Sequence, residues 1–369
     1  MTLMHTPSVR PRDLGLADAM PLPKRKDWRI GIVGFGEFAQ RAHAPDYKAA
    51  GWPVVAVAAS NPASRRVARE QFGIERVYSD YHELINDEAV EVIDLVTQPS
   101  VREKVVLAAA RAGKHVIVEK PLGTTAEECR RMVEAAEAAG VLLAVHQNYR
   151  WMKGNFLAHH IVNGGWIGSP FYAGVEKFGR QDESAGHPFY SECEHYLTLH
   201  GNTHFADLLR YWTGRDARRV SAYTARMTGQ NYRSDNLLIS LHDFGPGLTG
   251  HILHSELLRS SLSGNRCRID GDRGSLVFDF SGDEILLESR VLGGEVCRVE
   301  ASGMEWTEAL CGSMGDFLIS IEEGRDPSVS GRRNLATVDT VLAEMASVER
   351  GGAWVDVDGG KWNRNKSHE

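Results

Sequence analysis

Six residues near the start of the chain constrain its fold more than any others. They are Gly34-Phe35-Gly36-Glu37-Phe38-Ala39, which match the pattern G-x-G-x-x-A. They follow the apolar stretch "RIGIV" and open a segment with helical spacing. In such a turn the first glycine permits a tight bend, the second lets a pyrophosphate approach the backbone, and the small last residue lets helix and strand pack closely. The motif predicts a dinucleotide-binding turn with cofactor contacts from Gly34, Phe35, Gly36, Glu37 and Phe38.

The motif begins a regular alternation of short apolar runs and amphipathic stretches. The runs predict five strands, within residues 29–36, 54–60, 91–97, 115–120 and 142–149. The stretches predict four helices between them, within residues 38–51, 62–73, 101–113 and 125–140, several closed by glycine. Strands that alternate with helices indicate βαβ units and a parallel, doubly wound sheet.

The rhythm changes after Arg150. Two helices are expected early, over 154–163 and 200–212, followed by long alternating stretches that predict antiparallel strands. "DFGPG" at 243–247 predicts a hairpin turn between two of them, and a helix from about Asn334 closes the chain. We expect an α/β protein with an N-terminal Rossmann domain (28–148) and a C-terminal α+β domain (149–369) built on a large open, mainly antiparallel sheet. Residues 1–27 form an N-terminal arm, either a loose tail or a segment packed on the body or on another subunit.

Charge and composition exclude several classes of partner. The net charge is −7 with acids and bases mixed, and no long basic block is present, so nucleic acid is not an expected partner. No apolar run reaches the roughly 18 residues of a membrane span. The five cysteines are scattered, odd in number and without C-x-x-C spacing. They favour a reducing compartment, and a cytoplasmic protein is expected.

The end of the second predicted strand bears on cofactor choice. A carboxylate at that place bonds the adenosine 2′-hydroxyl and favours NAD. Here the chain has Ser60 and Asn61, with Arg65 and Arg66 just beyond. Ser60 and an arginine can hold a 2′-phosphate, although two arginines on a solvated helix face explain the pattern equally simply. The expected cofactor is therefore NAD(P), with a lean to NADP.

Glu119-Lys120-Pro121 end the fourth predicted strand. Ligands of open parallel sheets bind beyond the carboxyl ends of the strands, so a lysine at this place faces the cofactor crevice. Its ammonium group can bond a substrate oxygen and stabilise charge during hydride transfer. The alternative is an exposed surface lysine, the commoner situation for lysines in general.

At this point the chain resembles the Gfo/Idh/MocA oxidoreductases, the family of glucose–fructose oxidoreductase and inositol dehydrogenase. The resemblance rests on "GIVGFGEFA", "DLVTQPS", "AGKHVIVEKPL", "HQNYRW", "THFADLLRYWTG" and "DFLISIEEGRDPSVSG", and covers nearly the whole chain after the arm. It implies a nicotinamide cofactor, a sugar, polyol or related substrate, and a C-terminal sheet that often forms the oligomer interface. A homo-oligomer, dimer or tetramer, is expected.

The resemblance also implies roles for individual residues. Lys120 matches the catalytic lysine, and His204 matches the histidine that accepts the hydroxyl proton, a role suited to a group that titrates near neutral pH. Burial near a cationic nicotinamide is expected to lower the pKa of Lys120. The remaining expected contacts are Thr97, Gln98, Pro99 and Glu119 with the cofactor, and Tyr149, Arg150 and His200 with the substrate.

Three departures from the family pattern stand out. Many members carry aspartate where this chain has His200, and many carry histidine or asparagine where it has Val101 and Arg102. The acid after the second strand is missing. The first departure bears on the proton relay and the last on the choice of cofactor.

The histidines raise the question of a metal site. His195, His200, His204, Glu192 and Glu194 fall close together, and two histidines four apart on a helix can bind zinc. However, the glutamate of the H-E-x-x-H pattern is absent, and Gly201 and Asn202 suggest that the helix begins at about His204. No metal is expected, and His195 is interpreted as structural. Further candidates for the pocket are Trp151, His187, Pro188 and Tyr190, although Trp151 is equally suited to packing.

The function expected from these features is hydride transfer between a nicotinamide cofactor and a hydroxyl or keto carbon. Two alternatives stay open. One is an NAD-dependent glycosidase of the same family, which uses a transient oxidation without net redox change. The other is a non-catalytic protein that senses the cofactor, against which the presence of both Lys120 and His204 argues.

Overall fold

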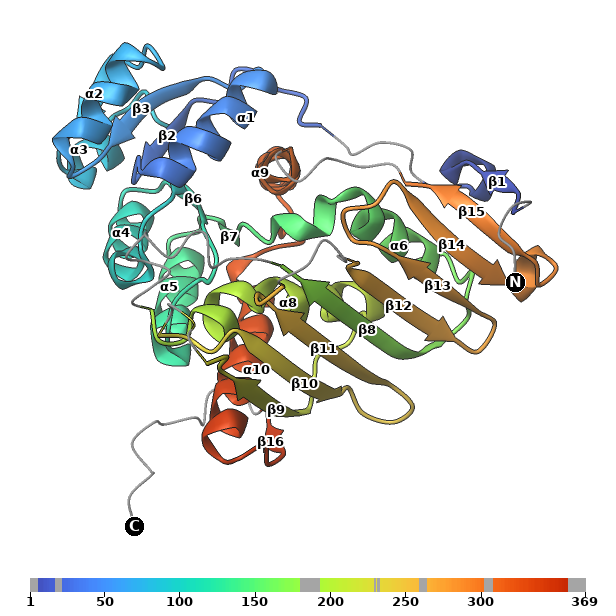
Figure 1. Cartoon of the computed structure of the whole chain (residues 1–369). Coiled ribbons are helices and arrows are strands. Elements are labelled where there is room, and N and C mark those ends of the chain that lie inside the picture. The colour runs from blue at the N-terminus through green and yellow to red at the C-terminus, as the bar shows by residue number, and fades with distance from the viewer. Residues whose placement is uncertain are drawn as a thin grey trace. The chain divides into compact units, whose positions relative to one another are not determined.

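The computed structural model describes residues 6–16, 22–179, 193–228, 230, 233–258, 264–301 and 308–357. Their contacts group into two compact units (Figure 1). One contains the described residues of 21–148 and 306–338, and we call it the nucleotide unit. The other contains those of 1–20, 149–305 and 339–369, and we call it the sheet unit.

The nucleotide unit is built on a parallel sheet of six strands. They are β2 (Ile30–Val33), β3 (Val54–Ala58), β4 (Arg76–Tyr78), β5 (Val92–Leu95), β6 (His115–Val118) and β7 (Leu143–Val145). The order across the sheet is β4-β3-β2-β5-β6-β7. The chain therefore moves outward from β2 to one edge and returns to build the other half from β5, with the reversal between β2 and β5. This is the doubly wound order of dinucleotide-binding folds, and the predicted class is confirmed.

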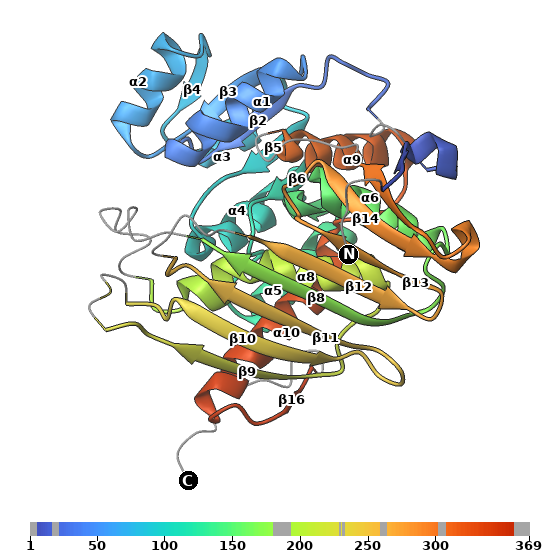
Figure 2. The same cartoon turned by 45° about the vertical axis from the view of Figure 1, so that its right-hand side comes forward.

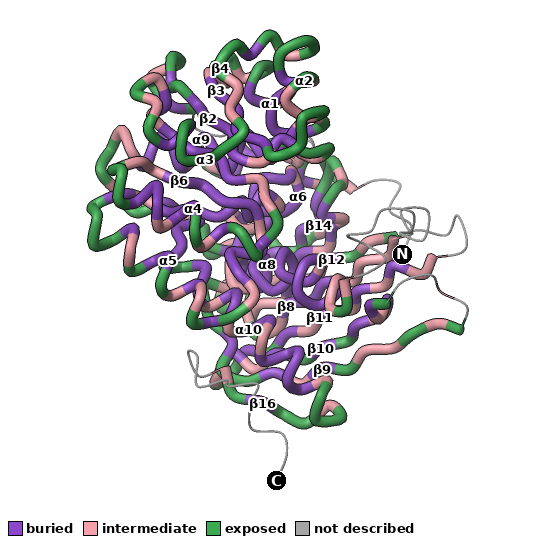
Figure 3. Tube along the Cα trace, turned by 90° about the vertical axis from the view of Figure 1, so that its left-hand side faces the viewer, coloured by how far each residue is buried: buried purple, intermediate pink, exposed green. Residues whose placement is uncertain are grey.

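Helices connect the strands. They are η3 (Ala39–His43), α1 (Ala44–Ala49), α2 (Pro62–Glu70), α3 (Tyr81–Ile85), α4 (Pro99–Arg111) and α5 (Ala126–Ala138), joined by α9 (Ala309–Glu323) from late in the chain. Thr125 accepts a hydrogen bond from the Glu128 backbone N–H and so caps α5. Every residue of β2 and β5 is buried, as expected for strands covered on both faces. Strand β2 is drawn in the purple of buried residues in Figure 3.

The prediction of five strands was one short. The sixth, β4, is only three residues long and begins with exposed Arg76. It pairs in parallel with β3 through Ala56, Val57 and Ala58. A strand this short shows no alternation in the sequence, and a long-range partner defines it.

The sheet unit contains a ten-stranded sheet. Its strands are β1 (Ser8–Val9), β8 (Pro170–Phe178), β9 (Arg219–Ala225), β10 (Leu237–Asp243), β11 (Thr249–Ser255), β12 (Arg266–Gly271), β13 (Gly274–Phe278), β14 (Glu284–Ser289), β15 (Val296–Glu300) and β16 (Val355–Asp356). Neighbours are antiparallel except β1 with β15 and β8 with β11. The predicted hairpin is confirmed, because β10 and β11 pair directly across residues 243–249.

Among the described residues, one face of the ten-stranded sheet is covered by helices, and the opposite face, which we call the open face, carries exposed side chains such as Ile239 and Leu241. The sheet unit also contains short helical segments: η2 (Pro11–Leu14), η4 (Asn148–Trp151, from Tyr149 on), η6 (Tyr196–Gly201) and η7 (Arg290–Leu292). Its longer helices are α6 (Lys153–Asn163), α8 (Thr203–Thr213) and the part of α10 (Gly331–Glu349) from residue 339 on. Helices α6 and α8 lie on one side of the strands (Figures 1 and 2). Burial alternates along β10, so that every second side chain points to the core.

The described part of the N-terminal arm makes contacts with the rest of the chain. Ser8 and Val9 add a parallel edge strand beside Arg298 and Val299, and Leu14 is buried. Farther on, the backbone N–H groups of Lys24 and Arg25 donate to the Glu322 carboxylate of α9. Of the two alternatives for the arm, the packed segment is the one observed for its described part.

No helix among the described residues is long and apolar enough to cross a membrane.

Candidate active site

The glycine turn has the geometry of a phosphate-binding loop. Gly34 has a φ of +92°, and a Cβ there would lie 2.4 Å from the Val96 carbonyl oxygen, so that position requires glycine. A Cβ on Gly36 would meet no atom within 4 Å, so the backbone is open to an approaching group. The Phe35 ring is buried against Phe72, which leaves its backbone to face the turn. These features fit a pyrophosphate at the start of the helix.

The residues expected near the adenosine ribose are already engaged in local contacts. The Asn61 side chain accepts from the Ala63 N–H at 2.9 Å and caps α2. Arg65 Nη1 donates to the carbonyl oxygens of Ala59 and Ser60 at 2.6 and 2.8 Å. The Arg65 guanidinium thus lies at the β3–α2 turn rather than along a solvated helix face, while the Ser60 residue is exposed.

Arg102 is a residue whose role the sequence did not reveal. It is 3% exposed, and its Nη2 donates to the Thr97 carbonyl oxygen at 2.7 Å, while its Nη1 donates to the Pro121 carbonyl oxygen. Arg102 therefore links the turn after β5 to the segment after Lys120. That turn contains Thr97, Gln98, which is exposed, and Pro99, which is buried. The only signal in the sequence was the departure of Arg102 from the residue type usual in the family.

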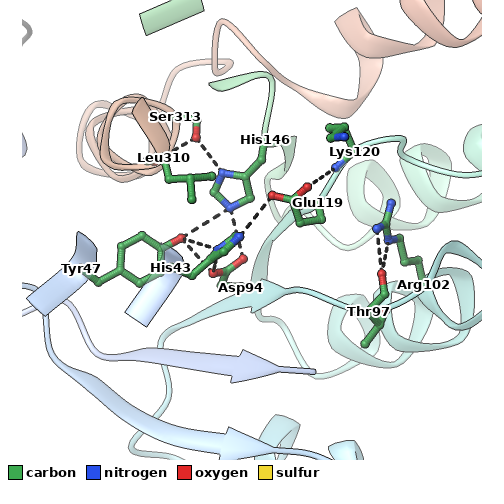
Figure 4. Close-up of polar contacts among 10 residues, drawn as sticks. All are labelled: His43, Tyr47, Asp94, Thr97, Arg102, Glu119, Lys120, His146, Leu310 and Ser313. Atoms are coloured by element: carbon green, nitrogen blue, oxygen red, sulfur yellow. Dashed lines mark hydrogen bonds and ion pairs between the residues drawn. The ribbon is translucent and has the colours of Figure 1, made fainter. Parts of the chain in front are cut away.

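A buried polar cluster lies behind Lys120 (Figure 4). The Lys120 backbone N–H donates to Glu119 Oε2 at 3.1 Å. Glu119 Oε1 lies 3.2 Å from His43 Nε2, and His43 Nδ1 lies 2.7 Å from Asp94 Oδ2. His43 and Asp94 are both 0% exposed, and Glu119 is 6% exposed.

Three further groups complete the cluster. The Tyr47 hydroxyl donates to Asp94 Oδ2 at 2.8 Å, and His146 Nε2 lies 3.2 Å from Asp94 Oδ1. His146 Nδ1 lies 2.7 Å from the Ser313 hydroxyl of α9. Burial alone lowers the pKa of His43, but the Asp94 and Glu119 carboxylates outweigh it and raise the pKa to about 10. The two carboxylates therefore favour the imidazolium form of His43.

The environment of Lys120 is set by burial and by two charged neighbours. Burial lowers the pKa of its ammonium group, the Glu119 carboxylate raises it, and the Arg102 guanidinium lowers it, with a net lowering. The direction is the one expected from the sequence. The physical cause now includes Arg102 as well as burial.

His204, the other expected catalytic residue, lies in the sheet unit on the first turn of α8. It is 6% exposed, and its ring stacks on the Tyr149 ring with centroids 3.9 Å apart and planes 7° apart. His200 lies in the preceding π-helical segment η6, also 6% exposed, with the Tyr196 ring beside it. The two histidines thus belong to different helical segments, as Gly201 and Asn202 had suggested.

Arg150 has a different environment from the one expected of a substrate-binding group. Its Nε and Nη2 donate to the two Asp207 oxygens at 2.6 and 2.7 Å, and Asp207 is only 1% exposed. This bidentate pair links η4 to α8 and fixes the elements that carry Tyr149 and His204.

A second polar cluster, not found from the sequence, lies beside η6. His254 Nε2 lies 2.9 Å from Glu256 Oε1, and Lys177 forms an ion pair with the same carboxylate. A Cβ on Gly201 would lie 2.8 Å from the His254 ring, so glycine lets η6 approach this cluster. The signal available was the presence of His254 and Glu256 at the inward-facing positions of β11 and just beyond it.

The remaining residues predicted from the sequence have no contact that indicates a role in a site, or lie outside the described residues. Trp151 is buried at 7% exposure, and His195 precedes η6. His187, Pro188, Tyr190 and Glu192 lie outside the described residues. Within the described ranges, one group has metal-ligand spacing, His43, Asp94 and His146, whose ligand atoms lie within 4.8 Å of one another.

Known proteins share this architecture. A family model described as the oxidoreductase family with an NAD-binding Rossmann fold, Gfo/Idh/MocA, matches residues 28–147. A D-apiose dehydrogenase from Paraburkholderia graminis is 28% identical over 88% of this chain and 89% of its own. A myo-inositol 2-dehydrogenase from Thermotoga maritima is 26% identical over 82% and 91%.

Solved structures show the same fold. An oxidoreductase from Agrobacterium radiobacter, in complex with NAD+, L-tartaric acid and magnesium, has a TM-score of 0.82 at 24% identity, over 90% of this chain and 98% of its own. A levoglucosan dehydrogenase in complex with NADH and levoglucosan has a TM-score of 0.78 at 24% identity, over 90% and 99%.

Fold and glycine turn together define an oxidoreductase with an NAD-binding Rossmann domain. Within that class, residues 28–147 match the NAD-binding domain of the Gfo/Idh/MocA family, and the relatives named above are similar to this chain over more than four fifths of its length.

Proposed function

We propose that the protein is a dehydrogenase that transfers hydride between a nicotinamide cofactor and a hydroxyl or keto carbon of a sugar, polyol or sugar derivative. The observation that carries the proposal is Lys120 at the carboxyl end of β6, supported from behind by Glu119 and His43. The relatives named as apiose and inositol dehydrogenases support the substrate class.

In the proposed reaction the nicotinamide, when bound, supplies the hydride acceptor. The Lys120 ammonium group donates a hydrogen bond to the substrate oxygen and stabilises the charge that develops there. The His204 imidazole accepts the hydroxyl proton as the oxidation proceeds. Stacking on Tyr149 restricts the His204 ring to one plane, so the nitrogen that accepts the proton is held in a fixed direction.

The proposed cofactor contacts come from the glycine turn, Ser60, Asn61 and Arg65, and from Thr97, Gln98 and Pro99 at the end of β5. The relatives include structures with NAD+ and NADH. The proposed lean to NADP rests on the absence of an acid at the β3 end and on Arg65, whose guanidinium lies at that turn. Tyr149 and His200 are proposed to contact the substrate.

We propose a homo-oligomer that associates through the open face of the large sheet. Tyr223, Ile239 and Leu241 are 62%, 41% and 48% exposed on adjacent strands, and Ile239 lies directly opposite Tyr223. Apolar side chains clustered on an open sheet face are typical of association surfaces. The five cysteines form no disulfide among the described residues, which supports a reducing compartment, as in the cytoplasm.

A panel of sugars and polyols, each offered with NAD+ and NADP+, tests the function. We expect the absorbance of the reduced nicotinamide to rise with at least one member of the panel, and NADP+ to be used more efficiently than NAD+. Release of a sugar from a glycoside without net cofactor reduction would instead identify the glycosidase. Cofactor binding with no turnover across the panel would favour the sensor, and strong preference for NAD+ would refute the role given to Arg65.

A further inference from the structure

The cluster behind Lys120 contains buried charged side chains where packing between strands would need only apolar ones. Two carboxylates, Asp94 and Glu119, are removed from water in the nucleotide unit, and burial of a carboxylate opposes its ionised form. His43 is the cation that lies between them, at 2.7 Å from Asp94 and 3.2 Å from Glu119 (Figure 4). His43 comes from η3, and its two partners come from the ends of β5 and β6, so three separate elements converge on one imidazole.

Hydrogen-bond accounting assigns the protons. Asp94 accepts from Tyr47 through Oδ2, which also faces His43, and faces His146 through Oδ1, so it is surrounded by donors and is ionised. His43 places Nδ1 2.7 Å from Asp94 Oδ2 and Nε2 3.2 Å from Glu119 Oε1, and the doubly protonated, cationic ring is the form that both carboxylates favour. Burial raises the pKa of Glu119, but His43 outweighs this, with smaller contributions from His146 and Lys120, and its pKa is lowered overall.

We propose that His43 is a positioning residue that bridges Asp94 and Glu119, keeps the Glu119 carboxylate ionised, and through it fixes the place and the charge of Lys120. Glu119 acts in two ways. Its Oε2 accepts from the Lys120 backbone N–H and so holds the strand end from which the side chain projects. Its charge also favours the ammonium form of Lys120, against burial and the Arg102 guanidinium. The proposal rests on the proposed function only in giving Lys120 a role in the reaction.

A metal ion is the alternative explanation of His43, Asp94 and His146. The three ligand atoms are close enough together, but each is already in a hydrogen-bonding contact inside the cluster. A bound divalent cation would take the place of the proton between His43 and Asp94. Contacts inside the cluster already engage the Asp94 carboxylate and both imidazole rings.

The test measures the pKa of the Lys120 side chain in the cofactor-free protein, from the pH dependence of its acetylation followed by mass spectrometry. Among the described residues, the charged groups that shift the Lys120 pKa include Glu119 and Arg102. The titratable groups that face His43 include Asp94, Glu119, Tyr47, His146 and Asp46. We expect Glu119→Gln to lower the Lys120 pKa by about one pH unit or more, as loss of a close opposite charge does. His43→Gln is expected to lower the Lys120 pKa as well, because the buried Glu119 carboxyl then lacks the cation that keeps it ionised.

The double variant His43→Gln/Glu119→Gln is expected to lower the Lys120 pKa no further than Glu119→Gln alone, because His43 acts through Glu119. The matched control is Ser313→Ala, which alters only the far end of the cluster beyond His146 and is expected to leave the Lys120 pKa unchanged. Additive effects of the two substitutions, or a Lys120 pKa that His43→Gln does not move, would overturn the proposal.

A measurement on the unaltered protein covers the case in which the variants do not fold. Nitrogen-15 NMR at about pH 8 is expected to show His43 with both nitrogens protonated, where an ordinary histidine is neutral. A neutral His43 at that pH, or a stoichiometric metal ion that His43→Gln releases, would contradict it. Because none of these readouts uses turnover, failure of the proposed dehydrogenase activity leaves the test intact. If activity is found, the alkaline limb of the pH profile of kcat is expected to move to lower pH in His43→Gln.

Discussion

At the scale of single residues, the buried Arg150–Asp207 pair links the two elements that carry Tyr149 and His204. Both side chains are nearly removed from water, and the two elements are η4 and α8. Removal of one partner from a buried pair leaves an uncompensated charge, which is usually more costly than loss of the pair as a whole.

Arg150→Met is therefore expected to lower the free energy of unfolding by about 3–5 kcal/mol, measured by urea denaturation. Arg150→Met/Asp207→Leu is expected to recover much of that loss, since no lone charge remains. The matched control is Arg332→Met, which breaks an ion pair with Glu137 whose side chains are 53% and 51% exposed. Such pairs contribute about 0–1 kcal/mol, and equal losses in the two single variants would refute the buried role of Arg150.

The pH dependence of stability follows from His43. Its pKa is raised from an ordinary 6.5 to about 10 in the folded protein, despite burial, by Asp94 and Glu119. The contribution of His43 to the free energy of unfolding is therefore complete below pH 6.5, and it is lost as the pH rises towards 10. We expect the free energy of unfolding to fall across that window, and to fall less steeply in His43→Gln. A parallel decline in the two proteins would show that other groups control alkaline stability.

The sequence could place Lys120 but not His43. Lys120 belongs to a local motif at the end of a strand, where the rules of parallel sheets say that ligands bind. The role of His43 depends on Asp94 and Glu119, which are 51 and 76 positions away and meet it only after the sheet has formed. Arg102 was noted only as an unusual residue, for the same reason.

At the scale of elements, the two glycines of the glycine turn are expected to have different roles, Gly34 in the fold and Gly36 in cofactor binding. Gly34→Ala is expected to destabilise the fold by at least about 1–2 kcal/mol, since alanine at positive φ is strained and its Cβ meets Val96. Gly36→Ala meets open space, so its free energy of unfolding should stay near that of the parent.

The same Gly36→Ala variant is expected to bind NAD(P)H at least about tenfold more weakly, because the new methyl group occupies the approach of the pyrophosphate. Thermal unfolding and fluorescence titration with the reduced cofactor separate the two effects. Full cofactor affinity in Gly36→Ala would place the pyrophosphate elsewhere.

Element prediction succeeded where periodicity was long and failed where it was short. The helix capped by Thr125 and the hairpin at 243–247 carry local signals and were found. Strand β4 and segment η6 have no period of their own to detect. Gly201 and Asn202 still marked the break between His200 and His204, because neither residue suits a helix interior.

At the scale of the whole molecule, the open sheet face is the feature with the clearest consequence. Leu241→Asp places a charge beside the exposed side chains of Ile239 and Tyr223. The Leu241 side chain is itself 48% exposed, so the substitution should disturb the core little. We expect light scattering to show an oligomer for the parent and a smaller species for Leu241→Asp, with secondary structure retained.

Asp235→Asn offers a conservative control on the loop before β10, and it should leave the assembly intact. A monomeric parent, or an assembly indifferent to Leu241→Asp, would exclude this face as the interface.

The feature of the whole molecule that was hardest to predict from the sequence is the return of a late segment of the chain to the nucleotide unit. A division at residues 148–149 is natural from the change of rhythm, yet the described residues of 306–338 group by contacts with the nucleotide unit. Within that unit, Ser313 of α9 contacts His146, and Val329 accepts from the Val145 backbone N–H at the edge of the parallel sheet. Long-range returns of this kind leave no periodic signal in the sequence.

The most direct test of the central claim is the kinetics of Lys120→Met on a substrate found in the panel, set beside its affinity for the cofactor. The control is Lys104→Met on the exposed face of α4. We predict that kcat/KM falls about 10²–10⁴-fold in Lys120→Met, with cofactor affinity close to that of the parent, and that Lys104→Met behaves as the parent. Full activity in Lys120→Met, with cofactor still bound, would contradict the account.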